Sequence, residues 1–168
     1  MTTATVLIGV SGSGKSTFLF KNNYDVYVCS TDKYVDQYAK DRELDYSDAF
    51  DKIQEENLFK DFTRLFYIDI ENCIRNNVDF VIDRTNLTIG FRQKLIGDIK
   101  SLADKYDKKV KINGICFDLP KNVVKERLAD RFTKTRKSIP EDVIENQFNA
   151  FEKPTVNEGF DNLEVISQ

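Results

Sequence analysis

A segment near the N-terminus reads Gly9-Val10-Ser11-Gly12-Ser13-Gly14-Lys15-Ser16-Thr17 and fits the pattern G-x-x-x-x-G-K-[ST]. Its glycines let the backbone curl so that successive N–H groups point at one anion, and Lys15 can reach the β- and γ-phosphates of a nucleotide. The Ser16 hydroxyl is placed to ligate Mg²⁺, and a helix that begins there directs its positive end at the phosphates. The predicted nucleotide contacts are Gly9, Ser11, Gly12, Ser13, Gly14, Lys15, Ser16 and Thr17.

The flanking segments fit this phosphate-binding loop, or P-loop. Thr5–Ile8 precedes it as a short apolar run of β-forming residues, and Phe18–Lys21 continues as a predicted helix. Strand, loop and helix in that order are the expected surroundings. A plain Gly/Ser turn would have no use for a lysine followed by two hydroxyls.

A candidate general base follows the second predicted strand, Val26–Cys29. Asp32 lies just beyond its end, and ligands of open α/β sheets bind at the carboxyl ends of strands. A carboxylate there could face the γ-phosphate and take a proton from an acceptor hydroxyl. The alternative is that Thr31 or Asp32 caps the helix predicted over Tyr34–Lys40.

A second acidic residue, Asp83, ends the buried strand predicted over Phe80–Ile82. This is the position of a Walker-B carboxylate, which can hold Mg²⁺-bound water. Thr85 and Asn86 follow in the loop and offer neutral hydrogen bonds to an acceptor or to phosphates. The alternative is a capped turn, because Asp and Asn are common turn residues.

Two arginines, Arg127 and Arg131, are spaced i,i+4 and so share one face of a predicted helix from Pro120 to about Phe132. Their guanidinium groups could clamp a transferring phosphoryl group. A solvated helix face is the alternative for such a pair. The helix leads into a basic connector, Thr133–Ser138, which is typical of a kinase lid.

The remaining segments alternate between strands and helices. The pattern predicts one long helix over residues 47–77, a helix over Phe91–Tyr106, a strand over Val110–Phe117, a helix from Pro140 to about Phe151 and a last strand over Leu163–Ile166. We therefore predict a single domain, residues 1–168, with an α/β fold. It has a mainly parallel sheet of four or five strands, helices on both faces and an arginine-bearing lid.

Composition narrows the possible chemistry. The 168 residues include no histidine, so a general base must be Asp, Glu or a less usual group, and His-dependent triads are excluded. The net charge of −3 argues against a protein that coats DNA electrostatically. The charge is uneven, because residues 121–137 carry seven bases and two acids.

The chain also carries signals about its location. Its apolar runs are only strand-sized, which predicts no membrane-spanning helix, and no signal-peptide pattern is present at the N-terminus. Cys29, Cys73 and Cys116 are scattered, with no C-x-x-C pair. This indicates a reducing, cytoplasmic compartment and argues against a zinc site.

Taken in order, the motifs resemble the 5′-polynucleotide kinases, above all the kinase module of the phage enzyme. The resemblance rests on the P-loop, Asp32-Lys33-Tyr34, Asp83-x-Thr85-Asn86, Arg127-x-x-x-Arg131 and Ile139-Pro140-x-Asp142-Val143. The tail Phe151-Glu152-x-Pro154-Thr155-x-x-Glu158-Gly159-Phe160 is similar to the animal enzyme. The resemblance as a whole covers nearly the entire chain and is consistent with a phage gene product in a host cytosol.

The resemblance implies transfer of the γ-phosphoryl group of ATP to the 5′-hydroxyl of DNA or RNA. Asp32 would be the general base, and Lys15 and Ser16 would hold phosphates and Mg²⁺. Asp83 would support metal-bound water, and Thr85 and Asn86 would contact the acceptor or a phosphate. Arg127 and Arg131 would stabilise the transition state. The acceptor nucleotide would pack against Ile139, Pro140 and Val143.

The sequence departs from the family in two places. The phage family has an arginine three residues beyond its base that grips an acceptor phosphate, whereas this chain has Val35, with Lys33 or Arg84 as possible replacements. Arg131 also lies nine residues before Pro140, a longer lid than the phage pattern, in which Arg136 is an extra candidate. The Asp-x-Asp signature of the associated phosphatase domain, followed by Gly-Thr, does not occur, so we expect kinase activity only.

Two other functions fit the same residues. One is a P-loop kinase for another hydroxyl: a nucleoside, a small metabolite or a hydroxymethylated base in DNA. The other is a nucleotide-binding switch without turnover, which would need no acid at position 32. A GTPase is disfavoured because the guanine-reading motif Asn-Lys-x-Asp does not occur. The sequence leaves open the choice between DNA and RNA, the residues that read adenine, and the oligomeric state.

Overall fold

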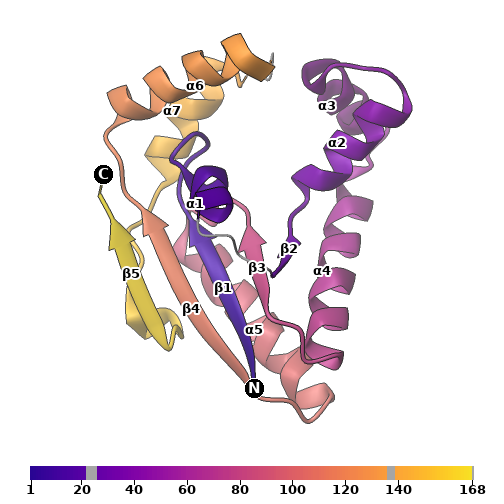
Figure 1. Ribbon diagram of the computed structural model, residues 1–168, viewed down its shortest axis with the longest axis vertical. Coiled ribbons are helices and arrows are strands. Elements are labelled where there is room, and N and C mark those ends of the chain that lie inside the picture. Colours follow the sequence, from indigo (N-terminus) through magenta and orange to yellow (C-terminus); the bar gives the residue numbers. More distant parts are fainter. Residues whose placement is uncertain (22–25, 136–138, 168) are drawn as a thin grey trace.

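The structure is a computed structural model that describes residues 1–21, 26–135 and 139–167. Within these ranges, five parallel strands form one sheet in the order β2-β3-β1-β4-β5 (Figure 1). The strands are β1 (Thr2–Ile8), β2 (Tyr27–Cys29), β3 (Phe80–Asp83), β4 (Val110–Phe117) and β5 (Asn162–Ile166). The predicted parallel α/β sheet is therefore confirmed, with five strands.

Helices connect successive strands. They are α1 (Lys15–Lys21), α2 (Asp32–Asp41), α3 (Tyr46–Glu55), α4 (Phe59–Arg75), α5 (Ile89–Lys105), α6 (Lys121–Thr135) and α7 (Glu141–Ala150), with a short 3₁₀ turn at Val156–Glu158. Figure 1 shows the α2–α3 pair and α6 on opposite sides of the carboxyl edge of the sheet. The elements at that edge carry the residues singled out in the sequence.

The central strand β1 is buried on both faces, as its continuous apolar run requires. Val6 packs with Phe66 of α4 and Ile99 of α5 on one side. Leu7 packs on the opposite side with Phe18 of α1. Figure 1 shows α5 behind the sheet and α1 in front of it, so helices cover both faces as predicted.

The long helix predicted over residues 47–77 was wrong, because the chain forms α3 and α4 separately. Asn57 adopts a left-handed conformation with a φ of 57°. The amide of Leu58 then donates to the Ile53 carbonyl at 2.9 Å, the bond pattern that ends a helix in a Schellman motif. The turn lets α3 pack on α2, through Val35 and Ile53, while α4 runs along the sheet.

Several element ends differ from the prediction. The helix α5 begins at Ile89, two residues early, because the Thr88 hydroxyl accepts a hydrogen bond from the Phe91 amide at 3.2 Å. The helix α6 extends to Thr135, three residues beyond the predicted end. The predicted break at Asn22-Asn23 and the connector residues 136–138, including Arg136, lie outside the described residues.

Two features of the structure bear on the predictions about the location of the protein. None of the helices in the described part of the chain is long and apolar enough to span a bilayer. Cys29, Cys73 and Cys116 are all buried as free thiols.

Candidate active site

A cavity of about 950 Å³ opens at the carboxyl edge of the sheet, bounded by the P-loop, the α2–α3 pair and α6. The sequence-predicted residues that line it are Ser11, Gly12, Ser13, Gly14, Lys15, Ser16, Thr17, Asp32, Asp83, Thr85, Arg127, Arg131 and Ile139. Four predicted residues are not part of its lining, namely Gly9, Asn86, Pro140 and Val143. The fold therefore brings most of the predicted site into one space.

The P-loop adopts the conformation that its glycines allow. Gly12 and Gly14 have φ values of 79° and 105°, which a residue with a Cβ atom rarely adopts. A Cβ added at Gly14 would lie 2.9 Å from Arg127 Nη1, so α6 approaches this backbone closely. Gly9 lies behind the loop, where its amide donates to the Thr85 carbonyl at 2.9 Å.

The buried amine of Lys15 points back into the P-loop. Its Nζ donates to the carbonyls of Gly9 and Val10 at 2.8 and 2.9 Å. Burial lowers the pKa of Lys15 to about 8, Asp83 acts in the opposite direction, and Arg131 lowers it further. The group is therefore a desolvated cation that a polyanion would stabilise.

A second buried group in the P-loop is the Ser13 hydroxyl, which has no hydrogen-bond partner among the described residues. An orphaned polar group of this kind in a buried loop is a candidate contact for a ligand.

Asp32 faces the cavity from the first turn of α2. Thr31 occupies the N-cap position but makes no capping hydrogen bond through its side chain. Asp32 Oδ1 instead accepts a hydrogen bond from the Tyr46 hydroxyl at 2.6 Å. Burial and this bond raise the pKa of Tyr46, so the phenol stays a donor. Tyr46 begins α3, and no motif in the sequence identified it.

Asp83 and Thr85 lie where the sequence placed them, at the end of β3. Asp83 is level with Leu7 of β1 and close enough to influence the pKa of Lys15. Asn86 differs from expectation, because its φ of 49° turns the side chain so that Nδ2 donates to the Leu7 carbonyl at 2.8 Å. It fastens the loop to β1, outside the cavity lining.

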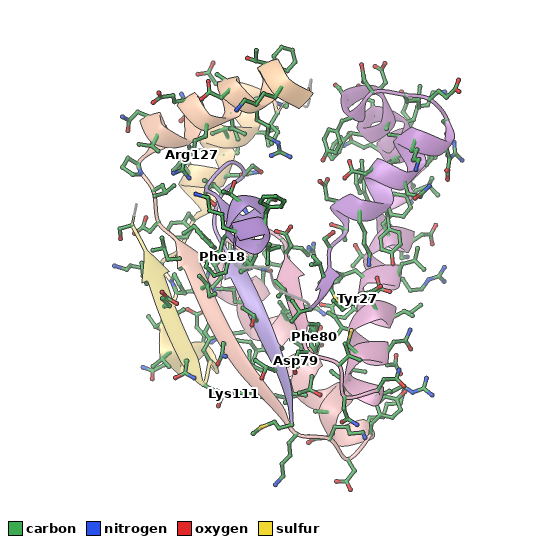
Figure 2. The ribbon with its side chains drawn as sticks, in the orientation of Figure 1. Phe18, Tyr27, Asp79, Phe80, Lys111 and Arg127 are labelled. Carbon is green, nitrogen blue, oxygen red and sulfur yellow. The ribbon has the colours of Figure 1, made fainter. Side chains whose placement is uncertain are left out.

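The C-terminal helices contact the P-loop from above. Arg127 lies over the loop, with Nη1 3.4 Å from the Ser13 carbonyl (Figure 2). The Ser11 amide donates to Gln147 Oε1 of α7 at 2.8 Å, and Gln147 Nε2 donates to the Ser11 hydroxyl at 3.1 Å. The sequence gave no signal for Gln147. Val143, on the same helix, is 37% exposed.

A fully buried ion pair supports the loop that carries Thr85 and Asn86. Arg92 Nε lies 2.6 Å from Glu158 Oε1, and Arg92 Nη1 donates to the carbonyls of Asn86 and Leu87. Arg92 Nη2 donates to the Glu152 carbonyl at 2.9 Å. The tail motif contained Glu158, but its partner was not predicted.

Together, a parallel sheet, a P-loop between β1 and α1, and a cavity shared with acids from β3 and α2 define the P-loop kinase fold. The chain belongs to the AAA_33 family, described as an AAA domain, whose model matches residues 5–154. This fold implies nucleotide binding, usually with Mg²⁺. Among curated proteins, none matches the sequence significantly.

Solved structures agree on the fold. A proposed kinase from Chloroflexus aurantiacus j-10-fl has a TM-score of 0.71 at 11% identity, over 99% of this chain and 85% of its own. A fungal RNA kinase has a TM-score of 0.61 at 15% identity, over 98% and 73%. A gluconokinase from Sinorhizobium meliloti 1021 has a TM-score of 0.54 at 16% identity, over 98% and 81%. The fold thus serves kinases of nucleic acids and of small molecules.

Proposed function

We propose that the protein transfers the γ-phosphoryl group of ATP to the 5′-hydroxyl of a DNA or RNA end. The observation that carries this proposal is the placement of Asp32 and the P-loop on one cavity of about 950 Å³. A phosphate held by the loop and a hydroxyl held by Asp32 would then share one space. Phosphoryl transfer depends mainly on such positioning and on electrostatic stabilisation.

The residues present fit ATP and Mg²⁺. The desolvated Lys15, the orphaned Ser13 hydroxyl and the left-handed glycines form a cradle for an anion. The described residues hold no cluster of three or more His, Cys, Asp or Glu residues that could bind a metal ion. Mg²⁺ can bind where the protein offers few ligands, because it keeps several waters and is held through phosphates and one or two protein oxygens. Ser16 and Asp83 would supply these oxygens, and the ion would neutralise charge on the phosphates.

Each remaining side chain has a role in the proposed transfer. One oxygen of Asp32 is held by Tyr46. The carboxylate would take the proton of the acceptor hydroxyl as the hydroxyl oxygen attacks the γ-phosphorus and ADP leaves with the bridging oxygen. Lys15, Arg127 and Arg131 would stabilise the charge on the transferring group. Asp32 and Tyr46 come from neighbouring helices, so the base is oriented before any substrate binds.

The acceptor is inferred from the comparisons and from the lining of the cavity. The likeness to a fungal RNA kinase favours a nucleic-acid end, and Ile139 lines the cavity as an acceptor contact would. We propose that Pro140 and Val143 complete that apolar surface, with Thr85 and Asn86 nearby. The second candidate is a small-molecule kinase. It is favoured by the gluconokinase likeness and by Val35, which is 2% exposed and points into the α2–α3 core rather than toward an acceptor.

A labelled-ATP assay tests the proposal. The acceptors are DNA and RNA oligonucleotides with 5′-hydroxyl ends, a nucleoside and gluconate. We expect label at the 5′ ends of oligonucleotides, and label on gluconate alone would favour the second candidate. Asp32→Asn should lower kcat by about 10²-fold or more while leaving ATP affinity unchanged. The matched control is Asp41→Asn at the exposed end of the same helix. Equal rates for both variants would contradict the role of Asp32.

A further inference from the structure

Arg84 is a cation of the cavity that the proposed transfer does not use. It follows Asp83 directly, at the end of β3, and its side chain lines the cavity with Asp32 and Lys15. Its guanidinium carbon lies 5.0 Å from the centre of the Phe66 ring on α4. The side chain is half-buried, and burial lowers the pKa of Arg84, with Tyr67 acting in the opposite direction.

No carboxylate neutralises this guanidinium within residues 1–21, 26–135 and 139–167. The ion pairs found there involve other cations, such as Lys33 and Arg92. An aromatic ring stabilises a cation but does not neutralise it. Burying a charged group without a counter-ion is costly, so a half-buried guanidinium at the edge of a cavity is suited to an anionic ligand.

An anion bound by Arg84 would lie on the side of the cavity where Asp32 would hold the acceptor hydroxyl. Strand β3 lies between β1, which leads into the P-loop, and β2, which leads to Asp32. The guanidinium lies toward α4, which packs beside β2 (Figure 1). Arg127 and Arg131 belong to α6, on the opposite side of the P-loop.

Lys33, the other possible replacement for the missing arginine, is committed elsewhere, and position 35 itself faces away from the cavity. Lys33 Nζ lies 2.9 Å from Asp69 Oδ2 and donates to the Tyr27 hydroxyl at 3.1 Å. Val35 is enclosed in the α2–α3 core with Ile53. Among the described residues, Arg84 is therefore the cation that this part of the cavity offers to an acceptor.

We propose that Arg84 binds an anionic group of the acceptor next to the hydroxyl that is phosphorylated, so that the enzyme selects acceptors carrying a phosphate or carboxylate there. This inference rests on the proposed phosphoryl transfer and names the acceptor class more closely. For a nucleic-acid end, the anion is the phosphate on the 3′ side of the terminal nucleoside. For a metabolite, it is a carboxylate. A neutral nucleoside lacks both.

The test compares charged and neutral acceptors in two variants. Thymidine 3′-monophosphate is compared with thymidine, and gluconate with glucose, at saturating ATP. Arg84→Gln removes the charge, and Arg84→Lys keeps it. Arg64→Gln, on α4 with a side chain 72% exposed, is the matched control. Thermal unfolding followed by circular dichroism shows whether each variant is folded.

We expect the wild type to prefer the charged member of the productive pair. Arg84→Gln should raise the KM for that acceptor by about 10- to 100-fold, the usual worth of a charge-assisted hydrogen bond. The KM for ATP and the rate with the neutral acceptor should stay unchanged, Arg84→Lys should recover part of the loss, and Arg64→Gln should resemble the wild type.

The outcomes separate this inference from the proposed function. An equal loss with charged and neutral acceptors in Arg84→Gln, or no loss with either, would overturn the role of Arg84. Transfer to gluconate and not to thymidine 3′-monophosphate or oligonucleotides would overturn the proposed function. If Arg84→Gln then raised the KM for gluconate but not that for glucose, the inference about Arg84 would still be supported.

Discussion

ATP binding at alkaline pH should draw a proton into the protein, because Lys15 has a lowered pKa in the free enzyme. Burial lowers the pKa of Lys15 to about 8, despite the opposing charge of Asp83. Bound phosphates would restore the pKa toward its ordinary value of about 10.4. The sign follows directly: above pH 8 the free amine is mostly neutral, and the bound amine is charged.

The magnitude follows from the same pKa. At pH 9 the free amine is about one-tenth protonated, so binding should take up about 0.9 proton. At pH 7 the uptake should fall to about 0.1 proton, and the affinity should be about tenfold higher than at pH 9. Isothermal titration calorimetry with a non-hydrolysable ATP analogue measures the uptake from the binding enthalpies in buffers of different ionisation enthalpy.

Two variants show whether Lys15 is the group responsible. Lys15→Met should bind the analogue more weakly and with no uptake at pH 9, whereas Lys40→Met, on the exposed side of α2, should keep the full uptake. A wild-type uptake near zero at pH 9, or the same uptake in Lys15→Met, would refute the reasoning.

Two further predictions concern partners found only in the structure. Tyr46→Phe removes the hydroxyl that orients Asp32, so kcat should fall, though less than in Asp32→Asn, while ATP affinity is unchanged; an unchanged kcat would rule out a role for the phenol in orienting the base. Arg92→Met leaves the Glu158 carboxylate buried without a counter-ion, which should lower the free energy of unfolding by about 3–5 kcal/mol in denaturant titrations. The double variant Arg92→Met/Glu158→Met should lose less stability than the sum of the two single variants, and a strictly additive double variant would show that the two side chains are not coupled.

The parts of the fold that are determined by residues close together in the sequence could be predicted. The P-loop, its flanking strand and helix, and the acids at strand ends are short motifs whose residue types determine their local geometry. The break at Asn57 was missed because apolar residues continue at helical spacing through residues 47–77. A single left-handed asparagine ends the helix there, and periodicity does not detect it.

The missed site residues share a different cause. Tyr46 reaches Asp32 across 14 residues, and Gln147 reaches Ser11 across 136, so each contact exists only once the helices have packed. Asn86 was predicted to face a ligand, but its backbone conformation turns its amide toward β1. Side-chain direction at a strand end depends on φ and ψ, which residue type alone does not fix.

The separate small core between α2 and α3 has a consequence for how the base behaves. Val35 and Ile53 join the two helices through one small core, on which Phe59 and Phe62 of α4 also pack, and this core is separate from the one beneath the sheet. Asp32 and Tyr46 both belong to this helix pair, so any displacement of the pair carries the carboxylate and its phenol together. Acceptors of different bulk could then change the separation between carboxylate and phosphorus without breaking the hydrogen bond between Asp32 and Tyr46. The distance over which the base reaches would then be adjustable while its orientation by Tyr46 is kept.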